Sequence, residues 1–349
     1  MKKLSWFNKV VFAFNIVITV LTILAYALPF LAPKLFPLLA VLTLVLPLFL
    51  ILNALFFLYW LLQLKRQMIL SGLILLLGIT FINKFYKFSS TEVAPQDNDF
   101  VVMSYNVRLF NLFKWLPKEE VGEEILSFIN EQNPDILCIQ EFSESANLDF
   151  RVYKYKYLYT QGKKIKSSQG IFSKYPIIDK GSIEFPESDN IVVYADIRKG
   201  TDTIRVYNMH LQSIKITPDV NEIQEDVNTI DKEKSQLVFN RIQTAFEKQQ
   251  SQAELFADHK RYCKYPLVIC GDMNNSAFSY VYRSVKGSLN DCFEEQGKGF
   301  GQTYKFKYYP ARIDYIFADK RFKVKSFQNF PDFVNSDHFP IMTRLMIEN

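Results

Sequence analysis

Residues 267–274 read Leu-Val-Ile-Cys-Gly-Asp-Met-Asn, a short apolar run that stops at Gly271 and is followed by Asp272 and Asn274. Four apolar residues that end at a glycine are typical of a buried strand. Polar side chains directly after such a strand lie where an α/β fold gathers its functional residues. Asp272 and Asn274 are therefore the first candidate site residues.

The same pattern recurs through the second part of the chain. The further polar residues at apolar runs are Asn106 after Val-Val-Met-Ser-Tyr, Glu141 after Ile-Leu-Cys-Ile-Gln, His210 after Arg-Val-Tyr-Asn-Met, Asp314 within Arg-Ile-Asp-Tyr-Ile, and Asp337-His338 before Phe-Pro-Ile. Each one alone is weak evidence, because a carboxylate after a strand is more often a helix cap or a turn former. The ordered set is much more specific. The remaining histidine, His259, has charged neighbours on a predicted helix and is interpreted as a solvated surface residue.

Apolar and β-branched patterns predict many strands with a few helices between them. The predicted strands cover residues 100–106, 136–140, 153–160, 170–173, 191–197, 203–209, 267–270, 312–317 and 339–346. Apolar residues at helical spacing predict a helix between residues 121 and 129 and a long one over residues 234–262. This mixture indicates an α/β or α+β layered sandwich.

The ordered motifs resemble those of the endonuclease/exonuclease/phosphatase superfamily. That superfamily includes DNase I-like nucleases, apurinic-site endonucleases, inositol-polyphosphate 5-phosphatases and bacterial sphingomyelinases. The resemblance covers about residues 98–348. It implies an α/β fold in the form of a four-layered α/β sandwich (DNase I-like), here preceded by N-terminal transmembrane helices.

The resemblance also implies a metal site. Glu141 is similar to the metal-binding Glu of the family, and Asn106 and Asp337 match residues that assist at the metal. Hard oxygen ligands with few protein contacts suit Mg²⁺, with Mn²⁺ as an alternative. The expected cofactor is therefore a divalent cation bound by these residues.

Catalytic roles follow from the same resemblance. Asp272 and Asn274 match the pair that orients the attacking water and the phosphate, with Asp272 as the base. His338 would contact a phosphoryl oxygen, and Asp314 would hold its imidazole in one tautomer. His210 would bind phosphate or act as the general acid.

The first part of the chain is apolar and has a different charge. Residues 1–90 contain eight basic residues and no acidic ones, which leaves 33 basic and 36 acidic groups in residues 91–349. The net charge of +5 therefore conceals +8 in the first part and −3 in the second. A basic surface for nucleic acid cannot be argued from this balance.

Long uncharged runs predict about three transmembrane helices over residues 10–32, 36–64 and 68–83. The third apolar run is shorter than a bilayer-spanning helix needs. It can span only if the long side chains of Lys65, Arg66 and Lys84 at its ends extend toward the membrane surface. A cleaved signal peptide, or one hairpin with an interfacial segment, are the alternatives. Basic residues beside the spans favour a cytoplasmic N-terminus, so three crossings would place the second domain outside the cytoplasm.

These observations give the expected organisation and function. Residues 1–85 form the membrane anchor, 86–98 a polar linker, and 99–349 the catalytic domain. We expect a multi-pass protein of the inner or plasma membrane that hydrolyses phosphodiester bonds in an endonuclease-like manner. The alternatives are a phosphodiesterase or phosphatase for lipid headgroups, whose site would carry an apolar rim such as residues 109–115, and a non-catalytic membrane scaffold. The expected partners are the phosphodiester substrate, either nucleic acid or a lipid headgroup, and the membrane, with no protein partner.

Overall fold

The computed structural model describes residues 4–91, 93–162, 166–214, 232–307 and 309–348. The chain divides into two compact units. Unit 1 is drawn from residues 1–85, 214–250 and 276–283, and unit 2 from residues 86–213, 251–275 and 284–349. Two segments of the second half of the chain therefore belong to the unit that contains the apolar N-terminal helices.

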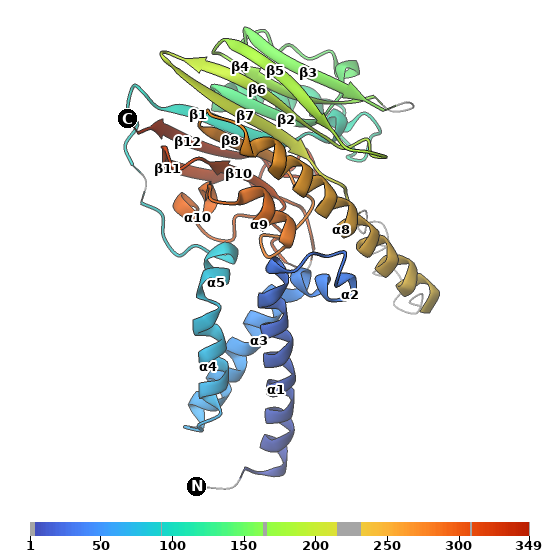
Figure 1. The fold of residues 1–349 in the computed structure, drawn as a ribbon, viewed down its shortest axis with the longest axis vertical. Coiled ribbons are helices and arrows are strands. Elements are labelled where there is room, and N and C mark those ends of the chain that lie inside the picture. Colours follow the sequence, from blue (N-terminus) through green and yellow to red (C-terminus); the bar gives the residue numbers. More distant parts are fainter. Residues whose placement is uncertain (1–3, 92, 163–165, 215–231, 308, 349) are drawn as a thin grey trace. The chain divides into compact units, whose positions relative to one another are not determined.

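Unit 2 is built on two mixed sheets (Figure 1). The first sheet has the strand order β11 (Phe322–Asn329), β12 (Ile341–Ile347), β1 (Phe100–Asn106), β2 (Ile136–Phe142), β4 (Ser167–Ser173) and β3 (Tyr155–Gln161). The second sheet has the strand order β5 (Ile177–Glu184), β6 (Ile191–Lys199), β7 (Asp202–His210), β8 (Leu267–Asp272), β10 (Asp314–Ala318) and β9 (Asn290–Asp291). Each sheet contains one parallel pair at its centre, β1 with β2 and β7 with β8.

The strand register brings several of the predicted site residues to one edge. His210 pairs with Asp272 across the parallel strands β7 and β8. Asp272 in turn pairs with Asp314 across the antiparallel strands β8 and β10. In the first sheet, Asn106 at the end of β1 is opposite Gln140, the residue before Glu141. Residues far apart in sequence thus meet because the strands end together.

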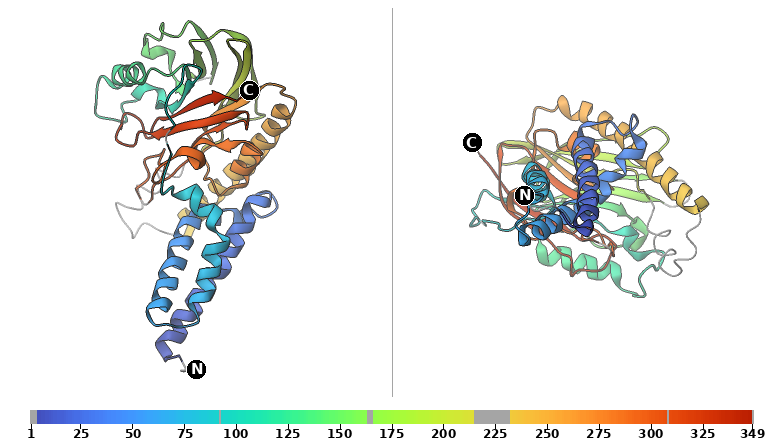
Figure 2. Two further views of the ribbon diagram at one scale, coloured as in Figure 1. Left: turned by 90° about the vertical axis from the view of Figure 1, so that its left-hand side faces the viewer. Right: turned by 90° about the horizontal axis from the view of Figure 1, so that it is seen from below.

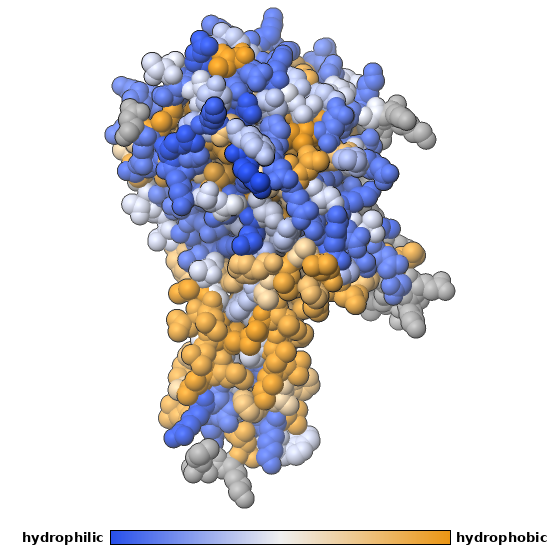
Figure 3. Space-filling model, viewed as in Figure 1, coloured by the Kyte–Doolittle hydropathy of each residue, from blue (hydrophilic) through white to orange (hydrophobic). Residues whose placement is uncertain are grey.

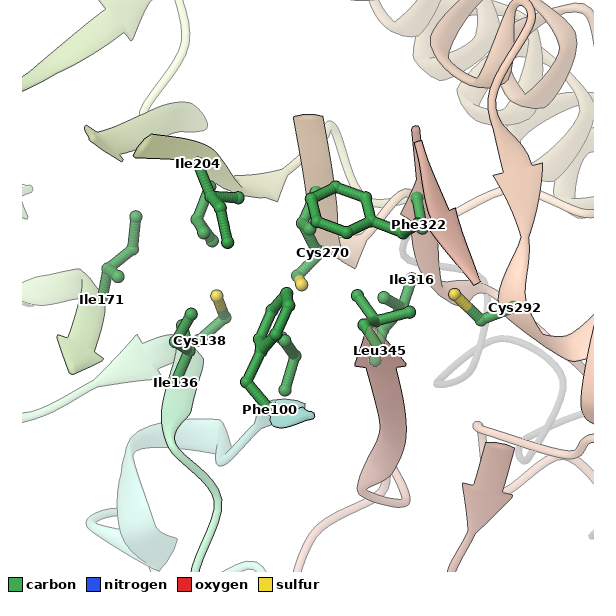
Figure 4. Packing of buried hydrophobic residues seen from close by; sticks show 14 of the residues in the cluster. Phe100, Ile136, Cys138, Ile171, Ile204, Cys270, Cys292, Ile316, Phe322 and Leu345 are labelled. Atoms are coloured by element: carbon green, nitrogen blue, oxygen red, sulfur yellow. The ribbon is translucent and has the colours of Figure 1, made fainter. Parts of the chain in front are cut away.

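The two sheets pack face to face around one apolar core (Figure 4). Phe100, Ile136 and Cys138 from the first sheet contribute to it, and Ile204 and Cys270 come from the second. All five side chains are fully buried. Burying a large apolar side chain is worth about 1.5–3 kcal/mol, so this layer is a main source of stability.

Helices cover the outer faces of both sheets (Figure 2). Helix α6 (Val121–Gln132) places Val121, Ile125 and Ile129 against the outer face of the first sheet. Residues 251–261 of α8 (Lys232–Arg261) cover the second sheet, where Phe256 contacts the ring of Tyr207. The short helix α10 (Cys292–Gln296) belongs to unit 2, whereas α9 (Tyr280–Lys286) begins in unit 1 and ends in unit 2. The predicted four-layered α/β sandwich is confirmed.

Most predicted elements are present, with bounds that differ by a few residues, and three strands were missed. β5 and β11 do not show clean alternation, and β9 has only two residues. β5 is an edge strand with several exposed polar residues. In β11 a bulge between Val324 and Ser326 breaks the register, and Lys325 is buried.

The interpretation of His259 as a solvated surface residue is wrong. Its ring is half-buried, lies 5.3 Å from the ring of Tyr194, and shares a hydrogen bond of 3.1 Å with the hydroxyl of Tyr207. Burial, reinforced by the nearby charge of Arg205, lowers the pKa of His259. Helix packing on the second sheet therefore determined its surroundings, which the charged neighbours in sequence did not indicate.

The segment predicted as a polar linker contacts unit 2 along its length. The backbone amide of Val93 donates to the carbonyl of Lys325, and the ammonium of Lys325 donates to the side chain of Gln96. Lys325 also pairs with Asp99 at 3.1 Å, and both side chains are almost completely buried. A buried pair of this kind leaves a costly charge behind if one partner is removed. The domain limits themselves stay a prediction.

The N-terminal helices of unit 1 are α1 (Trp6–Ala27), α3 (Leu42–Leu62), α4 (Met68–Leu77) and α5 (Ile79–Phe85), with short turns η1 (Leu28–Phe30) and α2 (Pro37–Ala40) between them. Two segments of the described chain, Trp6–Phe30 and Leu42–Leu62, are long and apolar enough to cross a membrane. Helices α4 and α5 meet at a bend of 66°, and they form a third span only if the two together are taken as one broken helix. Apolar side chains cover the outside of these helices (Figure 3).

Polar side chains lie inside this helical bundle. The amide of Asn15 in α1 donates to Ser71 in α4 at 2.8 Å, and Trp60 in α3 donates to Asn15 at 3.1 Å. Asn53 in α3 donates to Thr22 in α1 at 2.9 Å. Hydrogen bonds between helices with apolar exteriors are typical of membrane bundles. They hold α1, α3 and α4 in a fixed register.

The segment 276–283 completes unit 1. Phe278 is buried with Ala25, Leu46 and other apolar residues of the helices. The hydroxyl of Ser276 donates to the carbonyl of Thr43, and the ammonium of Lys84 donates to the carbonyl of Ala277. These helices therefore pack against a segment that directly follows the Gly-Asp-Met-Asn motif in the chain.

Candidate active site

The backbone around Asp272 is fixed by the glycine before it. Gly271 has φ = +132°, and a Cβ at this position would lie 2.0 Å from the carbonyl oxygen of Met209. Only glycine allows this close approach of β7 and β8. Gly271 therefore sets the position of Asp272 beside His210, which ends the neighbouring strand.

Asp272 is the centre of the candidate site, and its side chain is almost fully buried. The amide of Asn106 donates to it at 3.1 Å, and the backbone amide of Asn274 donates at 2.8 Å. The imidazole Nε2 atoms of His210 and His338 lie 3.7 and 3.6 Å from its carboxylate. Burial raises the pKa of Asp272, and the two histidines and the Asn274 amide oppose this shift. The raised proton affinity makes the Asp272 carboxylate a better proton acceptor for general-base catalysis.

His338 and Asp314 form a buried pair next to Asp272. Nδ1 of His338 lies 3.0 Å from one carboxylate oxygen of Asp314 and 3.2 Å from the other. Burial alone would lower the pKa of His338, but the charges of Asp314 and Asp272 raise it to about 10. The imidazole is therefore cationic at neutral pH, with Nε2 directed at the Asp272 side of the site. A cation placed in this way can stabilise negative charge on a phosphoryl oxygen.

Two residues outside the predicted set of site residues, Thr303 and Ser336, hold this pair in place. The hydroxyl of Thr303 accepts hydrogen bonds from the backbone amides of Ile313 and Asp314. The hydroxyl of Ser336 accepts from the amide of His338 and donates to the carbonyl of Asn106. Ser336 directly precedes Asp337-His338 in the sequence, and Thr303 lies in the segment before Arg312-Ile-Asp-Tyr-Ile.

The remaining predicted residues lie around Asp272. Asn106 also donates to Glu141 at 3.3 Å, so its amide joins Glu141 to Asp272. Nε2 of His210 lies 3.8 Å from Glu141. Glu141 adopts a left-handed backbone conformation, with φ = 49°, at a break in the pairing of β2 with β4. This break turns a residue of the strand end toward the site.

Asp337 is more open than Asp272 and Asp314 and pairs with a cation. Its carboxylate lies 3.1 Å from the guanidinium of Arg108, and about a quarter of its side chain is exposed. The backbone carbonyl of Asp337 accepts from the amide of Lys305. Arg108 therefore places positive charge at the rim of the site, next to the acidic centre.

The geometry can be compared with the needs of a divalent metal. Among the described residues, Asp272, Asp314 and His338 offer ligand atoms that all lie within 4.8 Å of one another. The predicted metal ligands are not these three residues but others at the same site, namely Asn106, Glu141 and Asp337. Glu141 and Asp337 supply partly exposed oxygen donors, which suit a hard cation, whereas Asp314 is already engaged with His338. The residues present therefore fit a divalent cation on the Glu141 side.

Asn208 and Gln140 stabilise the site from between the sheets. The side chain of Gln140 donates to Asn208 at 2.6 Å, and Asn208 donates to the carbonyls of Ile139 and Gly170. All of these groups are buried, so each hydrogen bond satisfies a polar atom that would otherwise be costly. Asn208 of β7 thereby fixes the second sheet against β2 and β4, next to His210.

A family model described as "Endonuclease/Exonuclease/phosphatase family" matches residues 103–338. The chain belongs to this family. The predicted resemblance is thus confirmed, and the family is divalent-metal-dependent. A second model, "Domain of unknown function (DUF8431)", matches residues 8–85. The comparison with curated proteins gave no match.

Solved structures of this family share the fold. The human Nocturnin catalytic domain is 16% identical, with a TM-score of 0.54, and the match covers 75% of this chain and 97% of that one. TDP2 from D. rerio with a single-strand DNA product is 14% identical, with a TM-score of 0.52 and coverage of 71% and 99%. The endonuclease/exonuclease/phosphatase from Bacteroides vulgatus is 19% identical, with a TM-score of 0.52 and coverage of 72% and 99%. At this identity they establish the fold of the chain alone.

Proposed function

We propose that the chain is a divalent-metal-dependent phosphodiesterase that its N-terminal helices hold in a membrane. One observation carries the proposal. Buried Asp272 lies within 4 Å of two imidazoles, one of which is held cationic by Asp314. A base next to fixed positive charge is what water attack on a phosphodiester requires.

In the proposed reaction, Asp272 accepts a proton from the attacking water. The water oxygen then forms a bond to phosphorus, and the ester bond between phosphorus and the leaving oxygen breaks. His338, oriented by Asp314, stabilises the charge on a phosphoryl oxygen. His210 donates a proton to the leaving oxygen, and Asn274 holds Asp272 in place through its backbone amide.

Glu141, Asn106 and Asp337 would hold the metal. Their oxygen donors suit Mg²⁺, and Mn²⁺ would bind through the same ligands. A bound divalent cation would neutralise charge on the phosphate and favour the attacking water in its deprotonated form. The amide of Asn106 keeps Glu141 beside Asp272, so the metal side and the base side of the site are fixed together.

The substrate is a phosphodiester, and the first expectation was an endonuclease-like reaction. Solved relatives support phosphoester chemistry with nucleotide compounds: D. rerio TDP2 was solved with single-strand DNA product, and ANGEL2 is described as a 2',3'-cyclic phosphatase. Residues 91–349 have a net charge of −3, which gives no general attraction to a polyanion. A lipid phosphodiester is the second candidate, because apolar side chains are exposed beside Arg108.

Topology is part of the proposal, and the helix register supports it. Asn15 contacts Ser71, and Tyr26, further along α1, contacts the carbonyl of Ile74, further along α4. The polypeptide from Met68 to Leu77 therefore runs in the same direction as α1, and α5 follows it after a bend of 66°. If α1 crosses the bilayer, this segment crosses it in the same sense, so the N-terminus and the catalytic domain lie on opposite sides.

Labelling from outside the cell tests this topology. Cys138, Cys270 and Cys292 are buried, so a Cys263→Ser background leaves no accessible native thiol among the described residues. We expect Asn98→Cys in this background to react with a membrane-impermeant maleimide on intact cells. Reaction only after permeabilisation would reverse the proposed orientation.

The hydrolytic function is tested with the full chain in detergent micelles. We expect hydrolysis of bis(4-nitrophenyl) phosphate that requires Mg²⁺ or Mn²⁺ and that Asp272→Asn reduces by at least about a hundredfold. Lys174→Met removes a charge far from the site, near Asp135, and serves as the control. Equal activity of Asp272→Asn and the unchanged chain would reject the proposed base.

A further inference from the structure

The loop that follows β1, residues 107–116, has an unusual backbone and is called the rim loop below. Arg108, Leu109, Phe110, Asn111 and Lys114 all have φ between 44° and 61°. Residues other than glycine rarely adopt this left-handed backbone conformation, and those that do cluster at functional sites. The surrounding structure must therefore determine the course of this loop.

Buried contacts fix the rim loop. Leu109 and Phe110 are buried, and the ring of Phe110 contacts that of Phe142. The side chain of Asn111 donates to the carbonyls of Leu116 and Lys118 and accepts from the amide of Leu116. The loop is therefore tied to the first sheet at one end and closed on itself at the other.

The fixed loop displays apolar side chains to solvent. Leu112 and Phe113 are each 47% exposed, and Trp115 is 39% exposed. The rings of Phe113 and Trp115 lie 5.0 Å apart, so these two side chains form one patch, and the exposed Leu112 precedes them in the chain. Large apolar side chains held together at the surface mark an interaction site.

Arg108 places this patch beside the active site. Its backbone amide donates to the side chain of Asn106, and its guanidinium pairs with Asp337 at 3.1 Å. The same guanidinium lies over the ring of Trp115 at 4.5 Å. One residue therefore joins the apolar patch to a carboxylate of the proposed metal site.

We propose that the rim loop binds the apolar part of a lipid phosphodiester while its phosphate occupies the active site. This inference rests on the proposed phosphodiesterase function and names its substrate class. Arg108 occupies one face of the Trp115 ring, and Leu112 offers no stacking surface, so the patch has fewer free aromatic faces than a platform for nucleobases. An apolar patch with the guanidinium of Arg108 beside it fits an acyl chain and a phosphate headgroup. Membrane-spanning helices in the same chain would keep such a substrate at high effective concentration.

The test compares lipid and soluble substrates with the full chain. The lipid probes are phosphatidylcholine, phosphatidylglycerol and sphingomyelin in detergent mixed micelles, and the other probes are bis(4-nitrophenyl) phosphate and a single-stranded oligonucleotide. We expect Leu112→Ser/Phe113→Ser to lower the ratio of kcat/KM for lipid to kcat/KM for the soluble diester by about tenfold or more. Phe113→Leu, which keeps an apolar side chain, retains most of the ratio.

A control variant has the same type of substitution elsewhere in unit 2. Val152 and Ile178 are 51% and 42% exposed, so Val152→Ser/Ile178→Ser removes similar apolar surface and leaves the ratio unchanged. An unchanged ratio in the rim variant would overturn the inference, as would a loss that affects the oligonucleotide and spares lipid. If the unchanged chain hydrolyses the soluble diester and none of the lipids, the inference fails and the proposed function stands. Absence of hydrolysis with every probe would reject the proposed function itself.

Discussion

Asp314→Asn separates the charge of the His338 partner from its hydrogen bond. The asparagine oxygen can still accept from Nδ1 of His338, so the imidazole keeps its orientation. The negative charge, however, is lost. At an effective dielectric constant of about 20, unit charges 3.0 Å apart interact by about 5 kcal/mol. Because the retained hydrogen bond preserves part of this interaction, we expect a loss of about 2–3 kcal/mol from transition-state stabilisation.

This loss corresponds to a reduction in kcat of about 30- to 150-fold. The assay is hydrolysis of bis(4-nitrophenyl) phosphate by the full chain in micelles, at saturating Mg²⁺ and neutral pH. Asp149→Asn is the matched control, since Asp149 pairs with Arg151 at an exposed position and has no contact with the site. Thermal unfolding of each variant shows whether the fold is retained. A folded Asp314→Asn protein whose kcat falls less than threefold would refute the role of Asp314 as the partner of a cationic His338.

Three further predictions test the metal site and the fold. Glu141→Gln should weaken the affinity for Mg²⁺ or Mn²⁺ by at least about tenfold in a calorimetric titration, and unchanged affinity would place the metal elsewhere. Gly271→Ala should destabilise unit 2 by more than about 3 kcal/mol, because its Cβ would overlap the carbonyl of Met209, and a near-normal unfolding temperature would contradict this account. Burial lowers the pKa of Lys260 to about 8, so the folded state releases this proton before the unfolded state does. The free energy of unfolding should therefore rise between pH 8 and pH 10 by up to about 2–3 kcal/mol. Lys260→Met should remove this rise and increase the unfolding temperature at pH 7. The same pH profile in both proteins would contradict a lowered pKa of Lys260.

The residues of the site could be predicted because each one lies at or near the end of a strand. Apolar runs located Asn106, His210 and Asp272, and the strand register then brought His210 and Asp272 together. The pairing of Asp314 with His338 was implied by the family resemblance, and the structure brings the two side chains to 3.0 Å. The roles of these residues stay predictions, since geometry alone does not show a reaction.

Other features could not be predicted, because they depend on contacts between distant segments. Thr303 supports Asp314 from a loop with no periodic pattern. The strand that contains Lys325 was missed because a buried ion pair with Asp99 replaces the apolar residue that alternation would require. The packing of Phe278 with the N-terminal helices likewise has no local signal. In each case a tertiary contact determines the environment of a side chain whose neighbours in sequence indicate something else.

The composition of unit 1 also limits how the protein should be studied. Unit 1 includes residues 276–283 and the described part of residues 214–250. In the sequence, these segments lie between strands of the catalytic fold. Phe278 and Phe246 are buried within this unit. Removal of the N-terminal helices would expose these side chains, so the full chain in micelles or nanodiscs is the appropriate preparation for every assay above.

The most direct test of the central claim is turnover of bis(4-nitrophenyl) phosphate as a function of Mg²⁺ concentration, measured in parallel for the unchanged chain and for His338→Ala. We predict saturable activation by the metal, loss of activity with EDTA, recovery when Mg²⁺ is added back, and a decrease of at least about a hundredfold in His338→Ala. Hydrolysis that persists in EDTA, or that His338→Ala retains in full, would contradict metal-dependent catalysis at this site.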